Sequence, residues 1–98
     1  MAMQLEDQAL ERAEVEARIK PYSGWKLESK ALRKTFELPS FLEAIAMVNR
    51  VAVVAEKLDH HPDFEIHYRK LTLSCWTHKH DAITEADLAL VREIEAVV

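Results

Sequence analysis

The sequence predicts an α+β fold in the order helix, hairpin, helix, hairpin, helix. Three stretches of the chain carry apolar residues at helical spacing, and four short runs between them alternate apolar and polar residues as paired strands do. A chain of 98 residues is long enough for one hydrophobic core. We therefore expect one domain that spans residues 1–98.

The first helix is expected over residues 5–19, which are rich in Glu, Ala, Arg and Leu and are followed by the helix-stopping Pro21. Its apolar stripe is thin, because it consists of Leu10, Ala13 and Ala17. We expect this helix to lie on the surface of the core and to have no catalytic role.

The first hairpin is expected over residues 25–28 and 32–38, which partly alternate on either side of Ser29-Lys30. The candidates for its inward face are Trp25, Leu27, Leu32 and Phe36. Trp25 has two interpretations. A core-filling role is favoured because buried aromatic residues dominate small cores, and the alternative is a stacking surface for a flat heterocycle.

The longest helix is expected over residues 40–58. Ser40 stands in the N-cap position, and Glu43 follows three residues later as in a capping box. The apolar stripe is broader than packing on one sheet requires, so we expect part of it to be exposed in a monomer and to form a homodimer or homotetramer. The residues expected in this exposed part are Met47, Val51 and Val54.

A second hairpin with one apolar face is expected over residues 64–78. Its apolar positions are Phe64, Ile66, Tyr68, Leu71, Leu73 and Cys75. We expect Cys75 to be an inert buried thiol and not a nucleophile, because no basic residue is obviously aimed at it.

The last helix is expected to begin at Thr84, with Asp87 three residues later. These two residues form a capping pair, which gives Asp87 a structural role that requires no catalytic function. The inward side of the helix is expected to consist of Leu88, Val91 and Ile94.

Charge, cysteine content and hydrophobicity indicate which partners and which cellular location to expect. The formal net charge is −4 and no Lys or Arg residues cluster, so we expect no direct contact with nucleic acid. Cys75 is the only cysteine and cannot form an internal disulfide, and residues 1–7 lack the basic and apolar regions of a signal peptide. We expect a cytoplasmic protein that does not contact a membrane, since no run is long and apolar enough to span one.

The candidate active site is the stretch from Glu56 to Pro62, together with Thr77-His78 and Asp87. Pro62 disfavours the α region at the preceding residue, so the long helix should end near Asp59 or His60. Helix carbonyls and neighbouring carboxylates favour a protonated imidazole there, which suits a proton donor. The alternative is that the histidine pair is only a solvated helix end.

The pattern resembles the signature of the pterin-4a-carbinolamine dehydratase family. The matching elements are Glu56-x-x-x-His60-His61-Pro62, Tyr68, Thr77-His78 and Thr84-x-x-Asp87, and they agree with that signature in order and spacing. The match extends from Gly24-Trp25 to the last helix. One departure is the run Asp81-Ala82-Ile83, where the family usually carries Gly-Gly-Leu, and substrate fit is most open to change at this loop.

The resemblance implies a four-stranded antiparallel sheet with three helices packed on one face. It implies dehydration of a 4a-hydroxytetrahydropterin to quinonoid dihydropterin in tetrahydropterin recycling, with a pterin as substrate and no cofactor. The reaction needs one proton delivered to the departing hydroxyl and one removed from the ring nitrogen, and histidine suits both tasks. The implied catalytic residues are His60, His61, His78 and Asp87, and the implied substrate-binding residues are Glu56, His61, Thr77 and His78.

Glu56 lies one helical turn before His60. At this spacing its carboxylate can reach the imidazole and hold its tautomer, or it can be an ordinary exposed helix residue. A metal site is a rival interpretation, with His78-x-His80 completed by His60, His61 or Asp81. That spacing matches no compact zinc motif and the resembling enzymes need no metal, so we expect none.

A second rival is a non-catalytic binding protein of the same fold. In the resembling family, some animal members also serve as a dimerisation cofactor of a homeodomain transcription factor, and degenerate relatives act as assembly factors. The presence of all three histidines and of Asp87 favours the enzyme.

Overall fold

The computed structural model describes residues 5–6 and 8–98, and the predicted element order is confirmed. Expectations about the start of the chain, at residues 1–4 and 7, lie outside the described residues. The elements are α1 (Arg12–Ile19), β1 (Lys26–Glu28), β2 (Ala31–Glu37), α2 (Phe41–Leu58), β3 (Asp63–His67), β4 (Lys70–Cys75) and α3 (Glu85–Val97).

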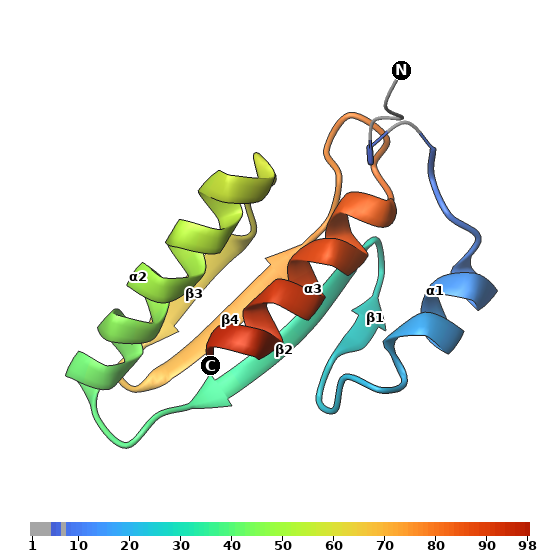
Figure 1. Cartoon of the computed structure of the whole chain (residues 1–98). Helices are drawn as coiled ribbons and strands as arrows, with labels where there is room; N and C mark the ends of the chain where they lie inside the picture. Colours follow the sequence, from blue (N-terminus) through green and yellow to red (C-terminus); the bar gives the residue numbers. More distant parts are fainter. Residues whose placement is uncertain (1–4, 7) are drawn as a thin grey trace.

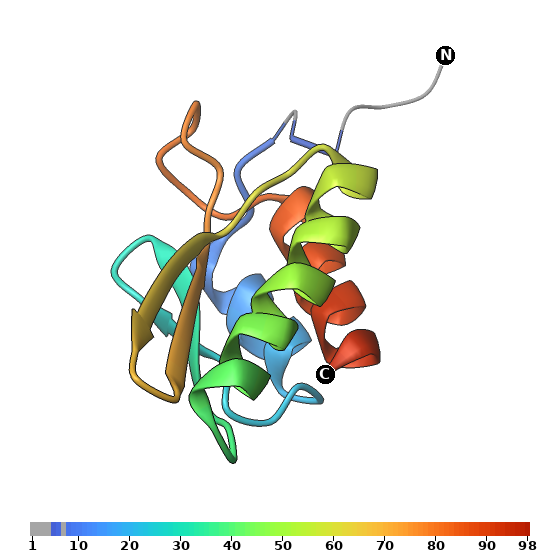
Figure 2. The same cartoon turned by 90° about the vertical axis from the view of Figure 1, so that its left-hand side faces the viewer.

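The strands form one antiparallel sheet in the order β1-β2-β4-β3. The two hairpins join through β2 and β4, whose register runs from Leu32 opposite Cys75 to Glu37 opposite Lys70. Figure 1 shows α2 and α3 lying over the sheet and running roughly along its strands, and Figure 2 shows the sheet nearly edge-on with all three helices on the same side. The expected α+β fold, with the helices on one face, is confirmed.

The core fills the space between the sheet and the helices. Its fully buried side chains include Leu32, Met47, Val51, Leu71, Leu73, Leu90, Val91 and Ile94. Trp25 belongs to this core, and its indole Nε1 donates to Glu95 Oε2 at 2.9 Å. Cys75 is also buried, and burial, helped by the charges of Asp87 and Asp63, raises the pKa of its thiol well above the ordinary value. Both expectations, a core tryptophan and a buried thiol, are confirmed.

Helix α1 begins at Arg12, so the expected start near residue 5 is wrong. The amide of Leu10 donates to the carbonyl of Ile83 at 2.8 Å and is therefore used by the loop before α3. Glu11 has extended backbone angles and stands in the N-cap position. Glu6 and Leu10 both hydrogen-bond to the loop that follows β4, and this placement matters for the site described below.

Helix α2 begins as expected, since Ser40 Oγ accepts from the amide of Glu43 at 3.1 Å. The expected exposure of Met47, Val51 and Val54 is wrong, because this side of the helix packs on the sheet and all three are buried. The exposed apolar side chains lie on the other side of α2 and include Leu42 at 76% exposure and Val53 at 60%. Among the described residues, none of the helices has the length and apolar character needed to cross a membrane.

The second hairpin departs from the expected pattern at its aromatic residues. Tyr68 lies in the turn between β3 and β4 with a left-handed φ of 58°, and its side chain is exposed. Phe64, on the edge strand β3, is partly exposed as well. The apolar face of the hairpin is therefore carried mainly by β4, through Leu71, Leu73 and Cys75.

Candidate active site

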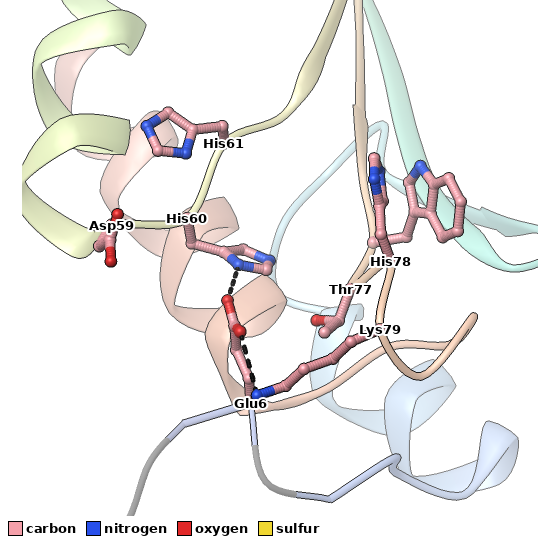
Figure 3. A pocket seen from close by; sticks show the side chains of 8 residues that line it. Glu6, Asp59, His60, His61, Thr77, His78 and Lys79 are labelled. Carbon is pink, nitrogen blue, oxygen red and sulfur yellow. Dashed lines mark hydrogen bonds and ion pairs between the residues drawn. The ribbon is translucent and has the colours of Figure 1, made fainter.

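A pocket of about 260 Å³ lies where the end of α2, the loop after β4 and the N-terminal segment meet. Figure 3 shows its side chains, and Figures 1 and 2 show these three segments at one end of the molecule. The lining residues are Glu6, Asp59, His60, His61, Trp76, Thr77, His78 and Lys79. All three implied catalytic histidines are among them. Glu56 and Asp87 do not line the pocket but hydrogen-bond to histidines that do.

The end of α2 aims the two adjacent histidines in different directions. The helix ends at Leu58, as expected, and Asp59 adopts left-handed backbone angles of 51° and 42°. The amide of His60 then donates to the carbonyl of Ala55 at 3.1 Å, which closes the helix end in the manner of a Schellman motif. As a result His60 turns inward and is 6% exposed, whereas the His61 side chain is 52% exposed.

His60 is held at both ring nitrogens by carboxylates. Its Nε2 lies 2.6 Å from Asp87 Oδ1, and its Nδ1 lies 2.5 Å from Glu6 Oε2. Ionised carboxylates only accept hydrogen bonds, so an ionised carboxylate at each ring nitrogen favours the imidazolium form, in which both nitrogens donate. Burial opposes this charge, but the hydrogen bonds and charges of Asp87 and Glu6 outweigh it and raise the pKa of His60 above its ordinary value.

Asp87 is fully buried and has two sets of partners. One oxygen accepts from His60. The other accepts from the hydroxyl of Thr77 at 2.7 Å and from the amide of Thr84 at 2.9 Å. The predicted capping box is thus confirmed, and the same carboxylate also fixes His60. The two interpretations of Asp87 that the sequence leaves open are geometrically compatible.

Thr77 lines the pocket, but its hydroxyl is committed to the interior. The hydroxyl hydrogen points to Asp87, so the neighbouring Thr84 hydroxyl, 2.8 Å away, donates to the Thr77 oxygen. The backbone of Thr77 pairs with Ala82, which closes the loop between β4 and α3. Within this loop Asp81 has a left-handed φ of 53°, a conformation that glycine favours and aspartate tolerates.

Glu56 binds His61 and not His60, so of the two interpretations that the sequence leaves open, the pairing with His60 is not found and Glu56 is an exposed helix residue. The Nε2 of His61 lies 2.6 Å from Glu56 Oε2. The left-handed turn at Asp59 is the reason, because it carries His60 away from the helix towards α3 and brings His61 back over the last turn. Both partners of this pair are exposed.

His78 forms the opposite wall of the pocket with Trp76. The two ring centroids are 3.9 Å apart and the ring planes are inclined by 38°. The indole Nε1 of Trp76 donates to Asp63 Oδ2 at 3.1 Å, and Lys30 Nζ lies 4.4 Å from the ring centroid. These contacts fix the tryptophan, which in turn supports the face of the His78 imidazole.

Sequence reasoning missed three residues of the lining, namely Glu6, Trp76 and Lys79, whereas Asp59 belongs to the predicted stretch from Glu56 to Pro62. The position of Trp76 directly before Thr77-His78 could have indicated its place. Glu6 gave no such signal, because it stands in an acidic stretch that favours a helix. Among the described residues, no group of three or more His, Cys, Asp or Glu side chains is arranged to hold a metal ion.

Known proteins with similar sequences belong to the family that the sequence pattern resembles. A family model described as Pterin 4 alpha carbinolamine dehydratase matches residues 8–97. A protein of Roseiflexus sp. strain RS-1, assigned as a pterin-4-alpha-carbinolamine dehydratase, is 43% identical over 98 residues, which cover 100% of both chains. A protein of Sulfolobus acidocaldarius with the same assignment is 32% identical over 88 residues, 90% of this chain and 97% of its own.

A solved structure has the same fold. It is the crystal structure of a protein from Brucella melitensis described as a transcriptional coactivator/pterin dehydratase, with a TM-score of 0.84 and 27% identity. The match covers 92% of this chain and 98% of the Brucella chain. The chain therefore belongs to the pterin-4-alpha-carbinolamine dehydratase family and is an enzyme of the hydro-lyase class.

Proposed function

We propose that this enzyme dehydrates a 4a-hydroxytetrahydropterin to the quinonoid dihydropterin by histidine acid/base catalysis, in tetrahydropterin recycling. The carbon–oxygen bond to the hydroxyl breaks and the hydroxyl leaves as water after gaining a proton. The neighbouring ring nitrogen loses its proton, and the remaining electron pair forms the carbon–nitrogen double bond. The observation that carries this proposal is a pocket lined by three histidines, one of which is held between two carboxylates.

The three histidines are suited to different tasks. Both ring nitrogens of His60 are occupied, so we assign it the task of placing a fixed positive charge at the pocket. Proton transfer to and from the substrate then falls to His61 and His78, which are exposed and stand on opposite sides of His60 in Figure 3. Glu56 supports His61, since a carboxylate at Nε2 leaves Nδ1 to face a ligand.

A coupled assay tests the proposed function. An aromatic amino-acid hydroxylase generates the 4a-hydroxytetrahydropterin, and formation of quinonoid dihydropterin is followed with and without this chain. We expect a rate well above that of the protein-free sample. A His61→Ala, His78→Ala double variant is the matched control and should return the rate to the uncatalysed level. Equal rates for the wild-type chain and the protein-free sample would refute the proposal.

We further propose that the chain is one dehydratase domain that forms a homodimer or homotetramer through α2. The exposed side chains of Leu42, Ala46, Asn49 and Val53 recur along one side of this helix at helical spacing. Three of these four side chains are apolar, and exposed apolar side chains favour burial against another copy. We also propose a cytoplasmic location. Disulfides are typical of proteins in oxidising compartments, and Cys75, the lone cysteine, cannot form one within this chain.

A second candidate function comes from the description of the Brucella protein as a transcriptional coactivator/pterin dehydratase. Such a role for this chain would be that of a dimerisation or assembly cofactor that binds a protein and not DNA, because the net charge is −4. The coupled assay separates the two candidates. Turnover that depends on His61 and His78 supports the enzyme, whereas a folded chain without turnover supports the binding role.

A further inference from the structure

We propose that Glu6 is a positioning residue for the dehydratase reaction and that, together with Asp87, it holds the His60 ring in place at the pocket. This inference rests on the function proposed above. The family model matches residues 8–97, so Glu6 lies before the part of the chain that the family describes. The hydrogen-bond partner of His60 Nδ1 is therefore Glu6 and not a residue of the family signature.

Glu6 is anchored by three contacts with two separate parts of the chain. Its Oε2 accepts from His60 Nδ1 at 2.5 Å, and its Oε1 lies 3.6 Å from Lys79 Nζ, as the dashed lines in Figure 3 show. Its backbone carbonyl accepts from the Nε2 of His80 at 2.5 Å. The Glu6 side chain is 31% exposed. These contacts hold the N-terminal segment against the loop that follows β4.

The second carboxylate changes what the His60 ring can do. An imidazole that is tied only through Nε2 can still turn about that contact, and its Nδ1 would face the pocket. With Glu6 on Nδ1, the ring is fixed from both sides, by α3 through Asp87 and by the N-terminal segment through Glu6. The lysine completes the arrangement, because it compensates the second negative charge.

The groups that face this site from each surrounding element define its charge. The neighbours are Asp87 from α3, Glu6 from the N-terminal segment, Lys79 from the loop after β4, the buried thiol of Cys75 from β4, and Asp59 and His61 beside His60 in the chain. Within the described part of the chain, only Asp87 and Glu6 hydrogen-bond to the ring of His60. The two contacts are unequal, because Asp87 is fully buried and Glu6 can be reached from solvent.

The test replaces Glu6 with glutamine, which keeps the shape of the side chain and removes its charge. The pKa of His60 is measured by NMR titration, and kcat/KM is measured against pH. An opposite charge at this distance changes a pKa by about 1–3 units, so the His60 pKa should fall by about 1 unit or more. The alkaline limb of the kcat/KM profile should move down by the same amount, with about tenfold lower activity at pH values above the wild-type pKa.

Glu11→Gln is the matched control. It removes the same charge from the same segment, at an exposed N-cap residue whose side chain makes no capping hydrogen bond. Its His60 titration and pH profile should equal those of the wild-type chain. If Glu6→Gln behaves like Glu11→Gln while all three proteins turn over substrate, the Glu6 proposal is overturned. If the wild-type chain and Glu11→Gln both lack turnover, the proposed function itself has failed.

Discussion

His60 and Asp87, at the end of α2 and in the first turn of α3, share a hydrogen bond of 2.6 Å beneath the pocket. The contact joins the ends of two helices through residues that are 27 positions apart in the sequence. Because the same carboxylate also accepts from Thr77 and Thr84, the position of His60 is linked to the start of α3.

Asp87→Asn should damage both stability and turnover. An asparagine has one acceptor oxygen for the three donors that Asp87 satisfies, so at least one buried donor loses its partner, at a cost of about 1–3 kcal/mol. The His60 imidazolium also loses a charged neighbour, so turnover should fall at least about tenfold and the alkaline limb of the pH profile should move down. Urea unfolding and steady-state kinetics measure the two effects.

Thr84→Ala is the control for Asp87→Asn. It removes the cap hydroxyl at a cost of about 1 kcal/mol and leaves the hydrogen bond between His60 and Asp87 intact. Unchanged turnover and pH profile in Asp87→Asn would leave Asp87 as a helix cap only.

Replacing His61 or His78 with alanine should cost turnover and little stability. Both side chains are exposed, so the free energy of unfolding should change by less than about 0.5 kcal/mol. Loss of a proton-transfer group should lower kcat by about a hundredfold or more. His67→Ala, on the exposed side of β3, is the control and should match the wild-type enzyme. Near wild-type kcat in both site variants would refute the assignment.

The stability of the chain should depend on pH through His60. Its pKa is raised in the folded state, so its contribution is complete below the unfolded-state pKa and is lost as the pH rises through the folded-state pKa. The free energy of unfolding in urea, measured between about pH 6 and pH 9, should therefore fall across this range. A His60→Gln variant should be less stable at low pH and should lack this component of the slope. Identical slopes in the two proteins would contradict the imidazolium assignment.

Removal of metal ions should leave activity unchanged. The imidazolium of His60 has no free nitrogen for a metal, and the Nε2 of His80 donates to the carbonyl of Glu6. Overnight dialysis against a strong chelator, followed by the coupled assay, checks this expectation. Loss of turnover that added zinc restores would favour the rival metal site.

The exposed side of α2 should control the oligomeric state. A Leu42→Glu, Val53→Glu double variant places two charges in the proposed interface, so light scattering should report a monomer where the wild-type chain forms a dimer or tetramer. Tyr68→Glu is the control, because it adds a charge at an exposed residue in the β3–β4 turn. A monomeric wild-type chain at micromolar concentration would contradict the proposal.

Local signals made much of the fold predictable. Ser40 with Glu43 and Thr84 with Asp87 place the starts of two helices, because capping depends on residues three apart in the chain. Pro62 places the end of α2 for a similar reason. The resemblance to a family signature groups His60, His61, His78, Thr77 and Asp87, and the structure brings them to one end of the sheet.

The hydrogen-bond partners of His60 and His61 were not predictable, because they depend on the direction that the backbone takes after the end of α2. Spacing alone pairs Glu56 with His60, but the left-handed turn at Asp59 gives His61 to Glu56 and leaves His60 for Glu6. The exposed side of α2 was misjudged for a related reason. Periodicity finds an apolar stripe, but only packing decides which part of a broad stripe meets the sheet.

The capping box of α3 has a consequence for hydrogen exchange. The amide of Thr84 donates to the same carboxylate that holds the His60 imidazolium. Deprotonation of the imidazole weakens its hydrogen bond to Asp87, so the first turn of α3 should open more often at high pH. The exchange rate of the Thr84 amide should then rise with pH by more than its intrinsic exchange rate does. The Thr84 amide thus reports the charge of an imidazole that follows the end of another helix, and its protection factor can follow ligand binding in the pocket without any turnover.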